Sequence, residues 1–259
     1  MVKWNVEQYL KFQKERTQPS MDLAFRIPLE SPGSILDLGC GPGNSTAVLR
    51  RRFPNARILG IDSSAQMIDA ARKSDPTLSF AQRDAATELA GWTERFDIVF
   101  SNACLQWVPN HPQVLQNIKV LLNPNGILAV QVPVNEEEPI HQILRRVCSS
   151  DRWRSKCSCT RFFYTLSESE YFDLLAQNFS DFTMWQTTYC HRMPSHESIL
   201  EWYRGTGMRP YLAVLSETDC SAFEAEVLQA VQEAYPVQKN GEILFRFPRL
   251  FFIAQKGKC

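Results

Sequence analysis

The chain has 259 residues, of which 44% are hydrophobic, and its 28 basic side chains balance its 28 acidic ones. This length fits one large α/β domain, or one domain with a small cap, around a substantial core. A formal net charge of zero argues against a general binder of nucleic acid or of a membrane surface. No apolar run reaches the ~18 residues of a membrane span, and the first residues lack the apolar core of a signal peptide. We therefore expect a cytoplasmic protein.

Helical periodicity and turn residues predict an alternation of helices and strands in the first half of the chain. This order indicates a parallel sheet with right-handed crossovers. The expected elements are a helix over 4–16, a strand over 34–38, a helix over 44–52, a strand over 56–61, a helix capped by Ser64, a strand over 78–83, a strand over 96–101, a helix over 111–122, a turn over 123–126 and a strand over 127–132.

Residues 139–180 break this alternation, with a basic cluster over 145–161 that is interpreted as a solvated face. A strand over 182–189, a helix over 195–203 and a long helix over 216–235 follow. The very apolar run over 243–254 predicts a last strand, in which Pro248 is expected at a bulge or an edge. The eight cysteines include only one close pair, Cys157 and Cys159, with no second pair at zinc-ribbon spacing. We expect reduced, structural thiols and no metal site.

The run over 35–43 reads Ile-Leu-Asp-Leu-Gly-Cys-Gly-Pro-Gly and carries the strongest functional signal in the chain. Gly39 and Gly41 remove the β-carbon where a strand turns into a helix, so that a ligand can touch the backbone. The dinucleotide fingerprint would need a further glycine in place of Asn44, and no Gly-Lys-Ser/Thr phosphate loop follows. The next strand ends in Asp62, whose carboxylate can accept hydrogen bonds from ribose hydroxyls. This combination resembles the class I S-adenosylmethionine-dependent methyltransferases.

That resemblance implies a Rossmann-like α/β fold with a seven-stranded, mostly parallel sheet, an antiparallel last strand and helical cap insertions. It also implies S-adenosyl-L-methionine as the cofactor and S-adenosyl-L-homocysteine as its product. Ligands of such sheets bind outside the carboxyl ends of the strands, where Asp62, Asp84 and Asn102 all stand. We expect Asp62 at the ribose, Asp84 at the adenine amino group and Asn102 at the amino-acid end of the cofactor. Met67 would pack on the adenine or belong to the core, and Trp107 would wall the site or simply pack. The expected cofactor-binding residues are Asp37, Gly39, Gly41, Asp62, Ser63, Met67, Asp84 and Asn102.

Three further runs are more particular: Leu-Gln-Trp at 105–107, Thr-Gly-Met-Arg-Pro at 206–210 and Phe-Pro-Arg-Leu-Phe at 247–251. With these runs, the chain is similar nearly end to end to the trans-aconitate 2-methyltransferase family. That family transfers a methyl group from S-adenosylmethionine to a carboxylate oxygen of trans-aconitate, a small tricarboxylic acid. The chain departs from the family pattern at Gln18, at 134–136 and over 150–162, segments that are expected to lie on the substrate side.

A carboxylate acceptor has a pKa near 4 to 5, so it is ionised at neutral pH and needs no general base. We therefore expect no catalytic acid or base, only residues that position the reactants. A tricarboxylate needs bidentate arginines and neutral donors to anchor it. Arg249 stands out as a charge in an apolar run, although it could face solvent, Arg16 could lie on an exposed helix face, and Arg209 could cap a helix. The expected substrate-binding residues are Tyr9, Arg16, His196, Arg209, Tyr211 and Arg249.

Two other functions remain open from the residues alone. One is methylation of another acidic acceptor, such as a malonyl-thioester or fatty-acid carboxylate, and the other is cofactor binding without catalysis. We expect one domain over 1–259, with a helical segment over 1–30, a cofactor-binding core over 31–135 and cap segments over 139–180 and 192–240. The expected partner is a small tricarboxylate, with no nucleic acid or membrane, and the protein is expected to be a monomer or a weak dimer.

Overall fold

The computed structural model describes the chain except residues 1–12, 158–162 and 259. The chain divides into two compact parts, which we call the sheet unit and the helical unit. The sheet unit holds the described residues of Gln13–Pro133, Phe163–Thr187 and Arg249–Cys259. The helical unit holds those of Val134–Phe162 and Thr188–Pro248.

The sheet has seven strands in the order β3-β2-β1-β4-β5-β7-β6. Neighbours among the first five strands pair in parallel, and β7 runs antiparallel to β5. The predicted fold, a mostly parallel sheet with an antiparallel last strand, is therefore confirmed. The strands are β1 (Ser34–Leu38), β2 (Arg57–Asp62), β3 (Ser79–Gln82), β4 (Phe96–Asn102), β5 (Leu122–Pro133), β6 (Asp181–Met193) and β7 (Ile243–Gln255).

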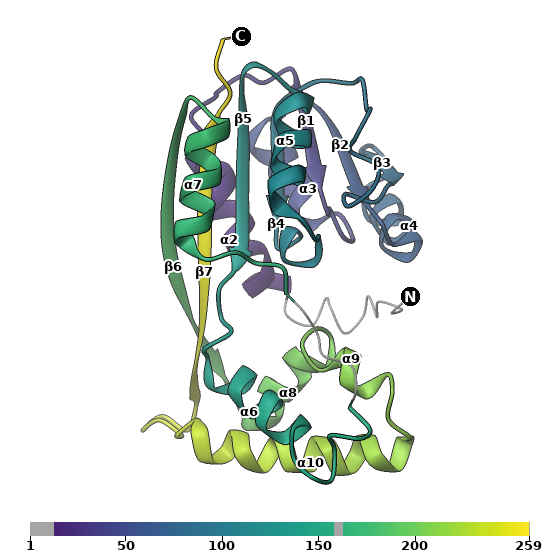
Figure 1. The fold of residues 1–259 in the computed structure, drawn as a ribbon, viewed down its shortest axis with the longest axis vertical. Coiled ribbons are helices and arrows are strands. Elements are labelled where there is room, and N and C mark those ends of the chain that lie inside the picture. The colour runs from purple at the N-terminus through teal and green to yellow at the C-terminus, as the bar shows by residue number, and fades with distance from the viewer. Residues whose placement is uncertain (1–12, 158–162, 259) are drawn as a thin grey trace. The chain divides into compact units, whose positions relative to one another are not determined.

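Helices cover both faces of the sheet (Figure 1). Helix α2 contacts both α3 and β5, whereas α5 and α7 contact each other on the opposite face. Apolar residues of β1 and β4 are fully buried between these layers, as the continuous hydrophobic runs of a parallel sheet require. The helices of the sheet unit are α2 (Gln13–Arg26), α3 (Asn44–Arg52), α4 (Ala65–Ser74), the short 3-10 helix η1 (Leu105–Trp107), α5 (His111–Leu121) and α7 (Glu168–Asn178).

Local capping chemistry explains several boundaries. Ser64 caps α4 as predicted, since its hydroxyl accepts a hydrogen bond from the backbone N–H of Met67. Ser167 caps α7 in a reciprocal capping box with Glu170. The strand over 34–38 and the helix over 44–52 agree with the sequence prediction at both ends.

Three predicted elements differ from the structure. The turn over 123–126 lies inside β5, because Leu122 pairs with Phe96 and Ile127 pairs with Ile98, so that the residues between form an irregularity in the strand. The first described helix is α2, which continues to Arg26 through Pro19 rather than ending at residue 16. Pro248 was expected at a bulge or an edge, and the edge alternative is excluded because β7 runs between β5 and β6.

The helical unit contains α6 (Pro139–Cys148), α8 (His196–Arg204), α9 (Arg209–Leu212) and α10 (Glu217–Ala234). Its core is aromatic, and the fully buried rings of Trp153 and Phe223 pack edge to face, 5.4 Å apart. Serines cap α8 and α10, as their predicted starts required. Within the part of the chain that the structure describes, no helix is long and apolar enough to cross a bilayer.

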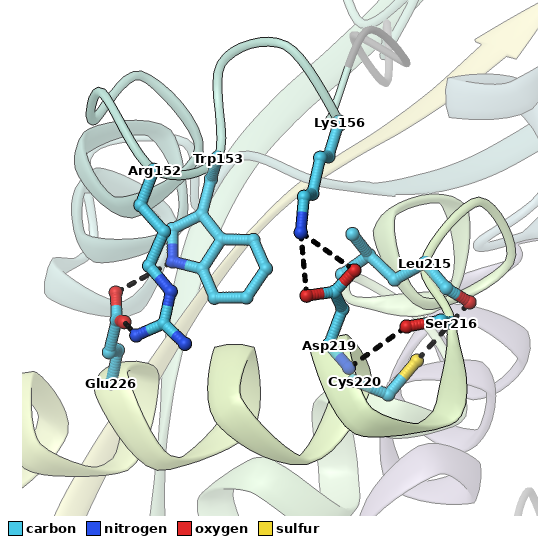
Figure 2. A network of polar contacts seen from close by, with 8 residues as sticks. All are labelled: Arg152, Trp153, Lys156, Leu215, Ser216, Asp219, Cys220 and Glu226. Atoms are coloured by element: carbon cyan, nitrogen blue, oxygen red, sulfur yellow. Dashed lines mark hydrogen bonds and ion pairs between the residues drawn. The ribbon is translucent and has the colours of Figure 1, made fainter.

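A polar network ties the segment after α6 to α10 (Figure 2). Glu226 accepts hydrogen bonds from the Trp153 indole Nε1 at 2.6 Å and from the Arg152 guanidinium. Lys156 donates to both carboxylate oxygens of Asp219, at 2.7 and 2.9 Å. Members of the predicted basic cluster are therefore held by acidic residues of their own unit.

Candidate functional site

The glycine-rich turn after β1 is fastened to the end of β2. The backbone N–H groups of Gly39 and Cys40 both donate to the carbonyl of Ile61, at 2.8 and 2.9 Å. Gly39 has φ +77°, and a β-carbon there would lie 2.3 Å from the Cys104 side chain. Gly41 has φ +54°, yet a β-carbon there would meet no atom within 4 Å among the described residues. Gly39 is thus needed for packing, while Gly41 gives the backbone an open approach.

Asp62, at the end of β2, holds the glycine loop directly. Its Oδ2 accepts a hydrogen bond from the Gly41 N–H at 3.1 Å, and its Oδ1 accepts one from the Ser64 N–H at 2.8 Å. Burial raises the pKa of the Asp62 carboxyl, and these two backbone donors oppose that rise. The adjacent Ser63 receives a hydrogen bond at its carbonyl from Gln82. The residue predicted to bind ribose therefore also fixes the loop beside it.

Asp37 is fully buried beneath the same loop. Its Oδ2 accepts hydrogen bonds from the Ser45 and Thr46 hydroxyls of α3, at 2.7 and 2.6 Å. Its Oδ1 is buried without a hydrogen-bond partner among the described residues. Burial raises the pKa of Asp37 from 3.8 to about 6. This carboxylate therefore ties β1 to the first turn of α3 and so sets the shape of the loop.

Two of the predicted adenine-side residues have clear local roles. Met67 is only 3% exposed and belongs to the core side of α4. Asp84 forms an Asx turn, because its Oδ1 accepts a hydrogen bond from the Ala86 N–H at 2.8 Å. The role of each at the adenine stays a prediction.

The end of β4 turns sharply after Asn102. Ala103 has φ +54°, a conformation that a residue with a β-carbon rarely adopts, and its N–H donates to the Gln131 carbonyl at 2.9 Å. The Asn102 Oδ1 is buried and has no hydrogen-bond partner among the described residues. Trp107 is half-buried against the Phe163 ring, at 5.1 Å, which supports its packing role.

Arg249 lies buried in β7, and this excludes the alternative in which it faces solvent. It is 5% exposed, and its Nη1 donates to the Gln131 Oε1 at 3.0 Å. Gln131 in β5 is fully buried and lies beside Asn102 in the sheet register. Gln131 was not among the expected site residues, although it stands as one polar residue within the apolar run over 127–132.

The remaining predicted substrate residues are distributed between the two units. Tyr9 lies outside the described residues, as does the side chain of Arg16, whose backbone is in α2. In the helical unit, the His196 Nε2 donates to the Tyr235 carbonyl at 2.8 Å. Arg209 begins α9, where partial burial lowers the pKa of its guanidinium. Tyr211 packs near the Phe223 ring. Their roles in substrate binding stay predictions.

Comparisons with known proteins identify the class of protein to which this chain belongs. A family model described as "Methyltransferase domain" matches residues 29–201. The fold is similar to the YcgJ protein of Bacillus subtilis, with a TM-score of 0.62 at 14% identity, covering 93% of this chain and 100% of that one. It is also similar to phosphoethanolamine N-methyltransferase 2 of Haemonchus contortus, solved with S-adenosyl-L-methionine, with a TM-score of 0.53 at 18% identity, covering 93% and 52%. The fold and the glycine-rich strand end thus define a class I methyltransferase.

Curated relatives narrow this assignment. Trans-aconitate 2-methyltransferases of Escherichia coli K12 and of Shigella flexneri are each 42% identical to this chain over 262 residues, covering 99% of both sequences. The chain belongs to the trans-aconitate 2-methyltransferase family.

The described strand ends fit S-adenosylmethionine, the donor of this class. Two buried acceptors, Asp37 Oδ1 and Asn102 Oδ1, lack partners among the described residues, and buried polar atoms of this kind need an explanation. The donor carries a cationic ammonium and a cationic sulfur, which complement acceptors rather than donors. The open backbone at Gly41 and the Asp62 carboxylate beside it fit the close approach of a nucleoside.

Proposed function

We propose that this protein methylates a carboxylate oxygen of trans-aconitate with S-adenosylmethionine as the donor. The observation that carries the proposal is the 42% identity, over 99% of both sequences, to relatives named for that reaction. The buried Arg249 in the sheet unit supports it independently, because a polycarboxylate needs a fixed cation.

On the donor side, S-adenosylmethionine supplies a methyl group that its positively charged sulfur has already activated. Asp62 would accept hydrogen bonds from the ribose hydroxyls, and Asn102 would accept from the amino-acid end. Asp84 would accept from the adenine amino group through the oxygen that its Asx turn does not use. These residues hold and orient the cofactor and carry no proton in the reaction.

On the acceptor side, the carboxylate is already the nucleophile at neutral pH. The protein must therefore anchor one carboxylate and leave another free to react, which is orientation rather than acid–base catalysis. The histidines His111, His141 and His196 are engaged in structural hydrogen bonds. Nε2 of buried His111 donates to the Leu105 carbonyl and its Nδ1 accepts from Tyr171, while His141 bonds to Tyr203 and His196 to Tyr235. These contacts support a mechanism without a general base.

The basic cluster over 145–161 does not favour a carrier protein as the acceptor, because its described cations are paired with acidic residues. Such an acceptor would need an open basic docking surface. Instead, described cations of the cluster pair with acidic residues, as Arg152 does with Glu226, Arg154 with Asp151 and Lys156 with Asp219.

We also propose that the chain acts in the cytoplasm as one methyltransferase domain. The cysteines that the structure describes as free thiols support a reducing compartment: Cys40, Cys104, Cys148, Cys157, Cys190 and Cys220.

The decisive experiment incubates the protein with isotope-labelled S-adenosylmethionine and a panel of di- and tricarboxylic acids, a fatty acid and a malonyl thioester. We expect one labelled methyl ester of trans-aconitate, identified by mass spectrometry. Label in the thioester or the fatty acid alone would replace the proposed acceptor. Tight donor binding by calorimetry with no ester from any acid would indicate a binding protein without catalysis.

A further inference from the structure

Polar side chains form a row across one face of the sheet on four adjacent strands, close to the carboxyl ends of β1, β4 and β5. Asp37 in β1 pairs in register with Phe100 in β4, and Asn102 lies two residues further along on the same face. Asn102 pairs with Gln131 in β5. Gln131 pairs with Phe251 in β7, and Arg249 lies two residues from Phe251, again on that face. Asp37 bonds to α3, so the row lies on the side of the sheet that α3 and α2 cover.

The orientation of the Gln131 amide is fixed by its neighbour. A guanidinium can only donate, so the atom that Arg249 Nη1 contacts must be the amide oxygen. The Gln131 Nε2 is therefore a donor, and it is buried without a hydrogen-bond partner among the described residues. An unsatisfied buried donor is unfavourable, and the side chain is fully buried. It needs an acceptor that the described protein does not supply.

The unused polar atoms of the row change from hydrogen-bond acceptors to a hydrogen-bond donor along its length. Asp37 and Asn102 offer unused acceptors at β1 and β4, whereas Gln131 offers an unused donor at β5, with the Arg249 cation beside it. Acceptors complement a cationic methyl donor, and a donor beside a guanidinium complements a carboxylate. The change from one to the other falls between Asn102 and Gln131, which are neighbours in register.

We propose that Gln131 is a carboxylate-binding residue for the methyl acceptor, acting as a pair with Arg249. Its Oε1 holds the guanidinium in place, and its Nε2 donates to the carboxylate that Arg249 binds. This inference rests on the proposed function, because it takes a polycarboxylate as the acceptor. It adds a specificity residue that was not among the expected substrate-binding residues.

The test measures binding and turnover separately. Calorimetry records the affinity of trans-aconitate for protein saturated with S-adenosylhomocysteine, and a second titration records the affinity for S-adenosylmethionine. Gln131→Glu replaces the donor by a charged acceptor beside Arg249, and Gln131→Met removes both polar atoms at similar volume. Gln113→Glu makes the same chemical change at an exposed position on α5 and serves as the matched control.

We expect Gln131→Glu to weaken trans-aconitate binding by at least tenfold, and Gln131→Met to weaken it by severalfold. Both variants should bind S-adenosylmethionine within twofold of the wild type, and Gln113→Glu should match the wild type throughout. Unchanged trans-aconitate affinity in both variants would overturn the proposal. So would an equal loss of affinity for the methyl donor, which would put Gln131 on the cofactor side. Unfolding of both variants would also overturn it, by showing that the residue serves the core.

Measurements of binding and of ester formation on the wild-type protein distinguish this inference from the proposed function. Binding of trans-aconitate without formation of an ester would remove the proposed reaction and leave the Gln131 assignment to be decided by the variants' affinities. An absence of binding to the wild type would overturn both.

Discussion

Two clusters of buried polar groups, one in each unit, differ in how completely they are hydrogen-bonded. In the helical unit, the Tyr203 hydroxyl bonds to Asn135 at 3.2 Å and to His141 at 3.0 Å, and the Tyr235 hydroxyl accepts from the Ile140 N–H. In the sheet unit, Asn102 Oδ1 and Gln131 Nε2 are buried at the strand ends without partners among the described residues. The polar groups of the first cluster bond to one another, while those of the second lack hydrogen-bond partners among the described residues.

This difference indicates where buried polar groups lower the stability of the protein and could be compensated by a ligand. An unsatisfied buried polar group costs about 1–3 kcal/mol, so it persists only where a ligand or a structural constraint compensates. The bonds within the Tyr203 cluster fix the packing of α6 against α8 and need no ligand. The strand-end atoms of the sheet unit are instead left without partners among the described residues, as is expected of the preorganised site that we propose there.

Arg249→Ala should give the largest effect in the sheet unit. The change removes a buried cation and leaves the Gln131 Oε1 without its donor. Truncating one member of a buried charged pair costs about 2–5 kcal/mol, so the Michaelis constant for trans-aconitate should rise roughly 30-fold or more. Steady-state kinetics and a donor titration measure this effect, and Arg246→Ala, an exposed arginine of the same strand, is the control. An unchanged constant would remove Arg249 from the acceptor site.

A second test of the sheet unit concerns pH. The pKa of Asp37 is about 6 in the folded protein against 3.8 for the unfolded reference, so folding takes up a proton between these values. The contribution of this group to stability is therefore greatest at low pH and is lost as the pH rises through 6. Asp37→Asn removes that dependence. The free energy of unfolding of the wild type, relative to the variant, should fall by about 2 kcal/mol between pH 4 and pH 7. Urea melts across this range measure it, and parallel pH profiles would contradict the buried, ionisable state of Asp37.

Asp62→Ala, at the end of β2, should weaken binding of the methyl donor without affecting binding of the acceptor. The change removes the acceptor that the Gly41 N–H uses and that we propose for the ribose hydroxyls. Hydrogen bonds to a charged group contribute about 1.5–3 kcal/mol, so donor affinity by calorimetry should fall roughly 10- to 150-fold. Asp69→Ala, at an exposed position on α4, should leave the affinity unchanged. Equal affinity in the Asp62 variant would exclude a ribose contact.

The sheet unit could be predicted further from the sequence than the helical unit, for a physical reason. Strands that are buried on both faces give continuous apolar runs, and the residues that follow them, Asp62 and Asn102, must gather at one end of a parallel sheet. The seven-stranded, mostly parallel sheet and its antiparallel last strand were expected from the resemblance and are confirmed, whereas the order of the strands was not predicted.

What the sequence could not show depends on side-chain pairing across strands. Gln131 looks like one polar interruption in an apolar strand until the register places it beside Asn102 and Arg249. The strained Ala103 is an ordinary residue in the sequence, since only the backbone reveals its positive φ. In the helical unit, nothing local indicated that Glu226 would meet Trp153, because the contact joins residues 73 positions apart.

Removing the contact between Glu226 and Trp153 should give the smallest of these effects. In the helical unit we expect a loss of stability without a loss of ligand affinity. Glu226→Ala leaves the indole N–H of the fully buried Trp153 without its acceptor, and this should lower the free energy of unfolding by about 1–3 kcal/mol. Asp219→Ala breaks the neighbouring Lys156 pair on the surface and should change stability less (Figure 2). Because these groups complete each other, neither variant should alter S-adenosylmethionine affinity. Thermal melts and calorimetry check both statements. A loss of S-adenosylmethionine affinity in the Glu226 variant without a loss of stability would contradict a purely structural role for this contact.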